Sequence, residues 1–307
     1  MGNFAAVDCG SLSTRLLISS GRGEPILRLT RVTGLGEGVD LSRALLPTAM
    51  ERSLAVLREY RALMDHHGVQ AVRMVGTSAL RDANNRESFS NAAAEVIGTG
   101  LSLISGEEEA SLSFLGATAE LSGTAGPWLV ADIGGGSTEL VVGPQPFGAR
   151  SLDMGCVRVT ERFLHEDPPS PLELSSAANW LTAQFRQAEA EVPALRSAAT
   201  LVGLAGTVSA LACFDQGLES YQHHRVHHYR LHRQAVERAL DDLEARPAAR
   251  RPGLPGIEAA RAPVIVGGTL VLSTLMVHFG FDECLVSEAD LLDGLVLSLV
   301  GPDGGST

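Results

Sequence analysis

Residues 130–143 read Val-Ala-Asp-Ile-Gly-Gly-Gly-Ser-Thr-Glu-Leu-Val-Val-Gly, an apolar strand that runs into an acidic, glycine-rich turn and then into a second apolar strand. Residues 5–19, Ala-Ala-Val-Asp-Cys-Gly-Ser-Leu-Ser-Thr-Arg-Leu-Leu-Ile-Ser, repeat this order. Each copy places an aspartate, Asp8 or Asp132, near the end of the first strand. Two such hairpins in one chain predict a duplicated fold that binds a phosphate chain.

The residue types of both turns favour a metal-phosphate site. Glycine allows backbone N–H groups to approach an anion closely, and nearby hydroxyl groups can add further donors. The residues predicted to bind phosphate in the two turns are Gly10, Ser11, Ser13, Gly134, Gly135, Gly136, Ser137 and Thr138. Asp8 and Asp132 would repel a bare phosphate, so we expect them to hold Mg²⁺, which then bridges to phosphate oxygens. The alternative for each copy is a tight hairpin without a ligand.

The two segments resemble the phosphate-binding motifs of the actin, Hsp70 and sugar kinase superfamily. Further segments narrow the resemblance to the exopolyphosphatase/guanosine pentaphosphate phosphatase family. They are Val-Gly-Thr-Ser-Ala-Leu-Arg-Asp-Ala (75–83), Ile-Ser-Gly-Glu-Glu-Glu-Ala (104–110), Asp-Met-Gly-Cys-Val-Arg-Val-Thr-Glu (153–161), Gly-Leu-Ala-Gly-Thr-Val (203–208) and Val-Ile-Val-Gly-Gly-Thr (264–269). Their order along nearly the whole chain makes the resemblance specific.

The resemblance implies an α/β protein with a duplicated ribonuclease H-like (actin-like ATPase) fold, in two domains with an interdomain cleft. We place the first domain at residues 1–124, with a C-terminal helix at about 288–302 packing back on it, and the second at 125–287. Residues 123–127, Gly-Thr-Ala-Gly-Pro, are the best candidate linker. Alternating strand and helix patterns, such as the helical spacing of Leu54, Leu57 and Leu63, agree with α/β layers.

The candidate catalytic base lies in the run Glu107-Glu108-Glu109. Charge at a helix N-terminus is the alternative reading of these acidic residues. In the family that the chain resembles, the glutamate directly before the small residue activates water, and that position is Glu109, with Glu108 as second choice. Hydrolysis of a terminal phosphoryl group needs such a carboxylate facing water.

Other side chains complete the predicted site. Glu139 should point the same way as Asp132 and position water or metal, unless it is a solvated charge. Arg81 matches a family arginine that contacts substrate phosphate, and its planar fork suits phosphate oxygens; a surface salt bridge to Asp82 or Glu87 is the alternative. Arg261, ahead of a turn predicted at 264–269, is a weaker candidate. Residues expected to line the second wall of the cleft are Gly206, Thr207, Gly267 and Gly268.

Two positions depart from the family pattern. Leu12 stands where the first phosphate motif usually has asparagine, and Leu292 stands where a later Leu-Arg-Glu-Gly motif has arginine. Either change could alter affinity, chain-length preference or activity. The chain also lacks the additional C-terminal helical domains of longer family members, which favours short polyphosphates as substrates.

Composition limits the remaining choices. The chain has 307 residues and is therefore large enough for two domains. Its formal net charge of −12 disfavours nucleic-acid binding. Its four cysteines, at 9, 156, 213 and 284, form no CxxC pair, and we expect buried, reduced thiols. The apolar run at 263–277 contains Gly267 and Gly268 and is too short to span a bilayer. No leader precedes the first strand, so we expect a soluble, cytoplasmic protein without membrane partners.

The segment His223-His-Arg-Val-His-His-Tyr-Arg-Leu-His232 raises a metal-binding alternative, because histidines four apart share a helix face. It also matches a family strand of the form Val-His-x-Tyr-x-Leu, in which such histidines do not form a compact ligand set. We therefore favour a polar segment near the cleft or a dimer contact. The basic loop at 246–256 could contact polymer phosphates or be an exposed connector.

Together these features predict a Mg²⁺-dependent phosphoric anhydride hydrolase. It would remove terminal phosphate from inorganic polyphosphate, processively or distributively, or from a nucleoside polyphosphate such as guanosine pentaphosphate. A kinase of the same superfamily is one alternative, and a catalytically weak regulator that binds nucleotides or alarmones is another. The sequence leaves the preferred substrate and chain length open. Family resemblance and the apolar run at 285–300 favour a homodimer.

Overall fold

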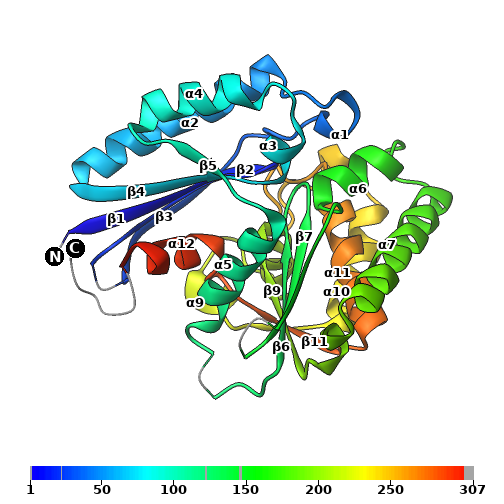
Figure 1. Cartoon of the computed structure of the whole chain (residues 1–307). Coiled ribbons are helices and arrows are strands. Elements are labelled where there is room, and N and C mark those ends of the chain that lie inside the picture. The colour runs from blue at the N-terminus through cyan, green and yellow to red at the C-terminus, as the bar shows by residue number, and fades with distance from the viewer. Residues whose placement is uncertain (1, 22, 122, 145–146, 301–307) are drawn as a thin grey trace. The chain divides into compact units, whose positions relative to one another are not determined.

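The computed structural model describes residues 2–21, 23–121, 123–144 and 147–300 (Figure 1). The chain forms two compact units. The first comprises Met1–Gly116 and the segment that begins at Leu291, and the second comprises Ala117–Asp290. Residues 301 and 302, the predicted end of the last helix, lie outside the described ranges.

The first unit contains one five-stranded sheet and its helices. The strands are β1 (Asn3–Cys9), β2 (Ser13–Ser19), β3 (Pro25–Val32), β4 (Val69–Gly76) and β5 (Leu101–Leu103). The helices are α1 (Val39–Ser42), α2 (Pro47–His66), α3 (Ser78–Asp82), α4 (Arg86–Ile97), α5 (Gly106–Thr118), whose last two residues group with the second unit, and α12 (Leu291–Val300). Pro47 begins α2 at a position where no N–H partner is required, and Gly98 ends α4 with a positive φ of 81°.

Both faces of this sheet are covered. Successive residues of β1 point to opposite sides and belong to two different buried clusters. Ala5, Val7 and Cys9 belong to a buried cluster that includes Leu57, Tyr60 and Phe89 of α2 and α4. Ala6 instead belongs to a second cluster, formed with Leu17, Val75, Ile104, Leu112, Leu291, Leu292, Leu295 and Val296. Figure 1 shows α2 and α4 on one side of the sheet and α12 on the other. The helix from the end of the described chain therefore completes the core of the first unit.

The second unit contains a six-stranded sheet. Its strands are β6 (Trp128–Ile133), β7 (Thr138–Gly143), β8 (Gly148–Leu152), β9 (Thr200–Leu204), β10 (Arg230–His232) and β11 (Glu283–Val286). Its helices are α6 (Cys156–Phe163), α7 (Pro171–Glu191), η1 (Pro193–Ser197), α8 (Ala205–Asp215), α9 (His223–Val226), α10 (Arg233–Glu244), η2 (Ala248–Arg250) and α11 (Ile265–Phe279). At the start of α7, Glu173 accepts the N–H of Ser170, and such backbone hydrogen bonds lower the pKa of Glu173.

The predicted duplication is confirmed by the strand order of the two sheets. The first sheet runs β3-β2-β1-β4-β5, and the second runs β8-β7-β6-β9-β11 with β10 added at its edge. In both, the first three strands are antiparallel neighbours and the central strand, β1 or β6, pairs in parallel with the next, β4 or β9. This repeated order is the ribonuclease H-like arrangement that the sequence predicted.

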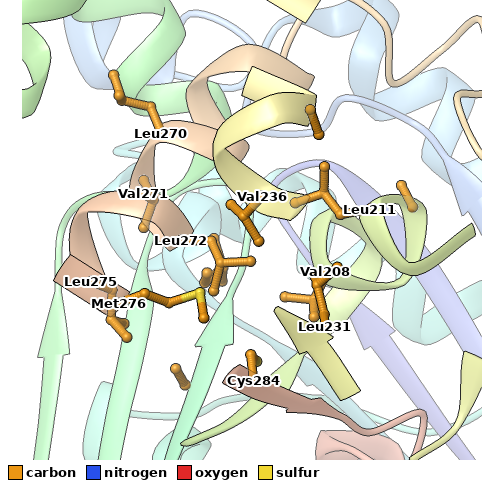
Figure 2. Packing of buried hydrophobic residues seen from close by; sticks show 14 of the residues in the cluster. Val208, Leu211, Leu231, Val236, Leu270, Val271, Leu272, Leu275, Met276 and Cys284 are labelled. Atoms are coloured by element: carbon orange, nitrogen blue, oxygen red, sulfur yellow. The ribbon is translucent and has the colours of Figure 1, made fainter. Parts of the chain in front are cut away.

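One large apolar core holds the helices of the second unit against its sheet. Figure 2 shows Leu270, Val271, Leu272, Leu275 and Met276 of α11 packed with Val208 and Leu211 of α8, Leu231 of β10, Val236 of α10 and Cys284 of β11. All four cysteines of the chain are free and buried, as predicted, and burial raises the pKa of Cys213 to about 11 and that of Cys284 to about 12.

The turn predicted at 264–269 is wrong, because these residues begin α11. The glycine pair suggested a chain break, yet Gly267 and Gly268 allow close helix packing. A Cβ atom on Gly267 would lie 2.5 Å from Oγ1 of Thr160 in α6, and one on Gly268 would lie 2.4 Å from Oγ1 of Thr207 in α8. The described helices include none with the length and apolar character needed to cross a membrane.

Gly294 of α12 provides a test of how the first unit is held together. A Cβ atom at this position would lie 2.0 Å from the backbone oxygen of Leu112 in α5. We predict that Gly294→Ala lowers the free energy of unfolding by about 1–3 kcal/mol, because the two helices must separate. Urea denaturation followed by circular dichroism would measure the change.

Gly100→Ala is the matched control, since a Cβ atom there meets no heavy atom within 4 Å. Its urea midpoint should stay near that of the unchanged protein. Equal midpoints for the two variants would contradict the packing role of Gly294.

Candidate active site

The first glycine turn connects β1 to β2. The N–H of Gly10 donates to the oxygen of Ser13 at 3.0 Å and closes the turn. Asp8 is 3% exposed and pairs across the strands with Arg15, whose Nε and Nη2 lie 2.9 Å and 2.8 Å from its Oδ2. Sequence reasoning missed Arg15, although its seven-residue spacing from Asp8 is the same as that of Glu139 from Asp132.

The second turn, between β6 and β7, has the same geometry. Gly134 donates to the oxygen of Ser137 at 3.0 Å. Asp132 pairs across the strands with Glu139, so both side chains lie on one face of the sheet, as predicted. They are 5% and 1% exposed, and the hydroxyl of Ser151 donates to Glu139 Oε1 at 2.7 Å. The equivalent position therefore carries a cation in the first unit and a second carboxylate in the second.

The carbonyl groups of the first turn accept hydrogen bonds from the chain that follows β3. The N–H of Gly36 donates to the oxygen of Ser11 at 2.8 Å, and the N–H groups of Thr33 and Gly34 donate to the oxygen of Leu12. A Cβ atom on Gly36 would lie 2.8 Å from that of Ser11, so glycine is required for this approach.

In the second turn, the start of α6 has this role. The N–H of Cys156 donates to the oxygen of Gly134 at 2.9 Å, and those of Val157 and Arg158 donate to the oxygen of Gly135. The buried side chain of Arg158 donates through Nε to the oxygen of Gly136 at 2.9 Å. Three consecutive carbonyl groups are thus directed toward α6.

The amide groups of the second turn have a different environment. Among the loop hydrogen bonds of the described residues, none has the N–H of Gly135, Gly136 or Ser137 as its donor. Successive N–H groups in such a turn can bind an anion. The hydroxyl of Thr138 is not available to phosphate, because its Oγ1 donates to the oxygen of Met154. Ser11 Oγ accepts the N–H of Ala79 at 3.1 Å, which leaves its own O–H able to donate.

The three glutamates at the start of α5 differ in their partners. Glu109 is 8% exposed, and its Oε2 accepts a hydrogen bond from Arg81 Nη1 at 2.6 Å. Glu108 pairs instead with Arg73 at 2.7 Å through a half-exposed side chain. The structure therefore brings together Arg81 and Glu109, which lie on different helices, and directs Glu108 elsewhere. The surface pairing predicted as the alternative for Arg81 is not the one observed.

The start of α8, directly after β9, contains Ala205, Gly206 and Thr207. Arg261 is 8% exposed and lies over Gly206, where a Cβ atom would meet its guanidinium at 2.3–2.6 Å. Ala205 has a positive φ of 71°, a conformation that costs energy for a residue with a Cβ atom. Gly206 thus provides the space that Arg261 occupies.

The likeness of the histidine segment to a family strand predicted a single strand, but the structure has a short helix followed by a short strand. His223 lies in α9 and His232 in β10, while the rings of His223, His227 and His228 stack at centroid distances of 5.3 Å and 3.8 Å. Burial and the neighbouring histidines lower the pKa of His227. The described residues contain no group of three or more His, Cys, Asp or Glu side chains able to hold a metal ion.

The two departures from the family pattern have different environments. Leu292 is 1% exposed and lies in the apolar cluster of the first unit, while its neighbour Asp293 pairs with Arg28. Leu12 is 8% exposed and occupies the turn position that Gly136 has in the second unit. An apolar side chain at 292 thus contributes to the core.

The carboxylates of the second hairpin suit a hard divalent cation. Mg²⁺ binds through one or two carboxylates together with water and substrate phosphate, so a protein cage of three side chains is not required. Asp132 and Glu139 supply two buried oxygen-donor groups on one face of the sheet. Asp8 has the same position in its hairpin but already contacts a cation, Arg15.

Residues 18–302 match the sequence profile of the Ppx/GppA phosphatase family. The chain belongs to this family. Exopolyphosphatase 2 of Mycobacterium tuberculosis is 40% identical to it over 314 residues, which cover 97% of this chain and 98% of the relative. Guanosine-5'-triphosphate,3'-diphosphate pyrophosphatase of Vibrio vulnificus is 31% identical, covering 97% of this chain and 59% of that protein.

The Ppx/GppA assignment agrees with solved structures. An exopolyphosphatase-like protein of known crystal structure has a TM-score of 0.93 to this chain, with 34% identity over 97% of this chain and 98% of the other. The sequence motifs that indicated the family therefore pointed to the correct fold.

The positive φ of Ala205 gives a prediction about stability. Ala205→Gly should raise the free energy of unfolding by about 0.5–1 kcal/mol, because relief of the left-handed conformation exceeds the added flexibility of the unfolded chain. Ala210→Gly, in the same helix, should lower it by about 1 kcal/mol. Denaturation of both variants would test this, and a loss of stability in both would contradict the strain at Ala205.

Proposed function

We propose that this chain is an exopolyphosphatase, which hydrolyses the terminal phosphoanhydride bond of inorganic polyphosphate. The observation that carries the proposal is the pair of glycine turns. Their carbonyl groups accept hydrogen bonds from neighbouring segments, so their N–H groups are suited to bind phosphate oxygens. The similarity to Exopolyphosphatase 2 over nearly the full length of both chains supports the choice of substrate. Guanosine pentaphosphate is the second candidate, supported by the similarity to the guanosine phosphatase.

Each unit supplies part of the chemistry. In the first, Glu109 accepts a proton from water while the water oxygen attacks the terminal phosphorus. The bond from that phosphorus to the bridging oxygen breaks, and its electron pair stays on the shortened chain, so the products are orthophosphate and a polymer one unit shorter. Arg81 and the first turn hold phosphate oxygens.

In the second unit, we propose that Asp132 and Glu139 hold Mg²⁺, which when bound supplies positive charge to the phosphate oxygens. The amides of Gly135, Gly136 and Ser137, together with Arg261, bind further oxygens. The pairing of Asp8 with Arg15 makes Asp8 the weaker of the two metal candidates. A cytoplasmic location remains a prediction from the sequence, and a homodimer remains one from the family resemblance and the apolar run at 285–300.

Phosphate release with Mg²⁺ would test the function directly. We expect turnover of short polyphosphate, and measuring long polyphosphate, guanosine pentaphosphate and ATP in parallel would identify the preferred class. Glu109→Gln should reduce kcat by about 10²–10⁴-fold, the usual contribution of a general base. Glu108→Gln is the matched control and should keep most activity, because that side chain pairs with Arg73.

The same assay separates the alternatives. Binding of these ligands without release of phosphate would overturn the hydrolase and favour a regulator. Transfer of phosphate from ATP to an acceptor other than water would favour a kinase.

The metal assignment gives a separate prediction. Asp132→Asn should raise the Mg²⁺ concentration needed for half-maximal activity by tenfold or more, because the cation loses one of its two charged ligands. Asp8→Asn should change that concentration less and mainly raise KM. Titration of Mg²⁺ with both variants would decide, and a larger effect of Asp8→Asn on the Mg²⁺ requirement would assign the metal to Asp8.

A further inference from the structure

Arg81 and Glu109 form one of the more buried ion pairs of the first unit. Arg81 Nη1 donates to Glu109 Oε2 at 2.6 Å, and the two side chains are 22% and 10% exposed. The same Nη1 also lies 3.2 Å from the oxygen of Ile104. Glu109 lies near the start of α5. Its backbone N–H donates to the oxygen of Ser105 at 2.9 Å, which fixes the backbone that carries the carboxylate.

This pairing conflicts with the roles of both residues in the proposed hydrolysis. A carboxylate that accepts a hydrogen bond from a guanidinium group is a weaker base than one facing water. An arginine that donates to a carboxylate has fewer donors for phosphate. Both roles are therefore favoured when the pairing is released.

We propose that Arg81 exchanges partners when substrate binds. Its guanidinium moves from Glu109 to the terminal phosphoryl group, and the released carboxylate can then accept a proton from water. This inference rests on the proposed function and adds a control of the same site. The guanidinium then has two states, one that holds the base and one that holds the substrate.

The charges favour the exchange. A terminal phosphoryl group has more negative charge than a carboxylate and offers several oxygens for a bidentate contact with arginine. On exchange, Glu109 loses a cation and gains an anionic neighbour, and both changes increase its affinity for a proton. The base is thus weak without substrate and strong with it.

Other charged groups near this pair have partners of their own. On α5, Glu108 contacts Arg73 of β4. On α3, Asp82 lies 3.3 Å from Arg43, and Arg86 of α4 donates to the backbone oxygen of Arg81. Glu107 lies on the same helix turn as Glu109. None of these contacts needs to break when Arg81 moves its side chain.

Proton uptake on ligand binding tests the exchange without turnover. The probe is methylenediphosphonate, a non-hydrolysable diphosphate, added with Mg²⁺ at about pH 5 in two buffers of different ionisation enthalpy. Calorimetry should show that the unchanged protein takes up more protons on binding than Glu109→Gln does. Glu108→Gln should match the unchanged protein.

The Arg81→Gln background separates partner exchange from simple repulsion by the ligand. There the contact between Arg81 and Glu109 is absent before the ligand arrives, so adding Glu109→Gln should change proton uptake much less. An equal effect in both backgrounds, or no effect of Glu109→Gln in either, would overturn the exchange. Absence of binding to the unchanged protein would contradict the proposed function and the exchange together, whereas binding with equal proton uptake would contradict the exchange alone.

Discussion

The hydrogen bonds accepted by the carbonyl groups of the two glycine turns are the constraint on which the site depends. A glycine turn by itself presents both donors and acceptors, and the acceptors would repel an anion. Here the chain after β3 binds the carbonyl groups of Ser11 and Leu12, and the start of α6 binds those of Gly134, Gly135 and Gly136. Each unit solves the same electrostatic problem with a different element.

Duplication has been followed by specialisation at one position. The residue opposite the turn aspartate is Arg15 in the first hairpin and Glu139 in the second. One hairpin therefore places a cation opposite its carboxylate, and the other places a second carboxylate there. The distinct chemistry that we propose for the two units rests on this difference, rather than on the similarity of the turns.

The sequence predicted most of the fold, because its strongest signals are local. The helical spacing of Leu54, Leu57 and Leu63 predicted a helix, and all three residues lie in α2. The glycine pair at 267 and 268 was misread, since a glycine that permits close packing of helices has the same local signature as one that permits a turn.

The site was predicted less completely. The two aspartates followed from a repeated motif, but the contact of Arg81 with Glu109 joins residues that are 28 positions apart in the chain and depends on tertiary structure. Arg15 was missed because its signal is the spacing it shares with Glu139 in the other hairpin, and an arginine does not match a glutamate in residue type.

The position of α12 has a consequence for biosynthesis. This helix covers the face of the first sheet that contains Ala6, Leu17 and Val75, although it is the last element described. The second unit is a continuous segment and can fold as soon as it leaves the ribosome. The first unit is begun earlier but keeps an apolar surface open until synthesis passes Val296, so it is the later of the two units to complete its core.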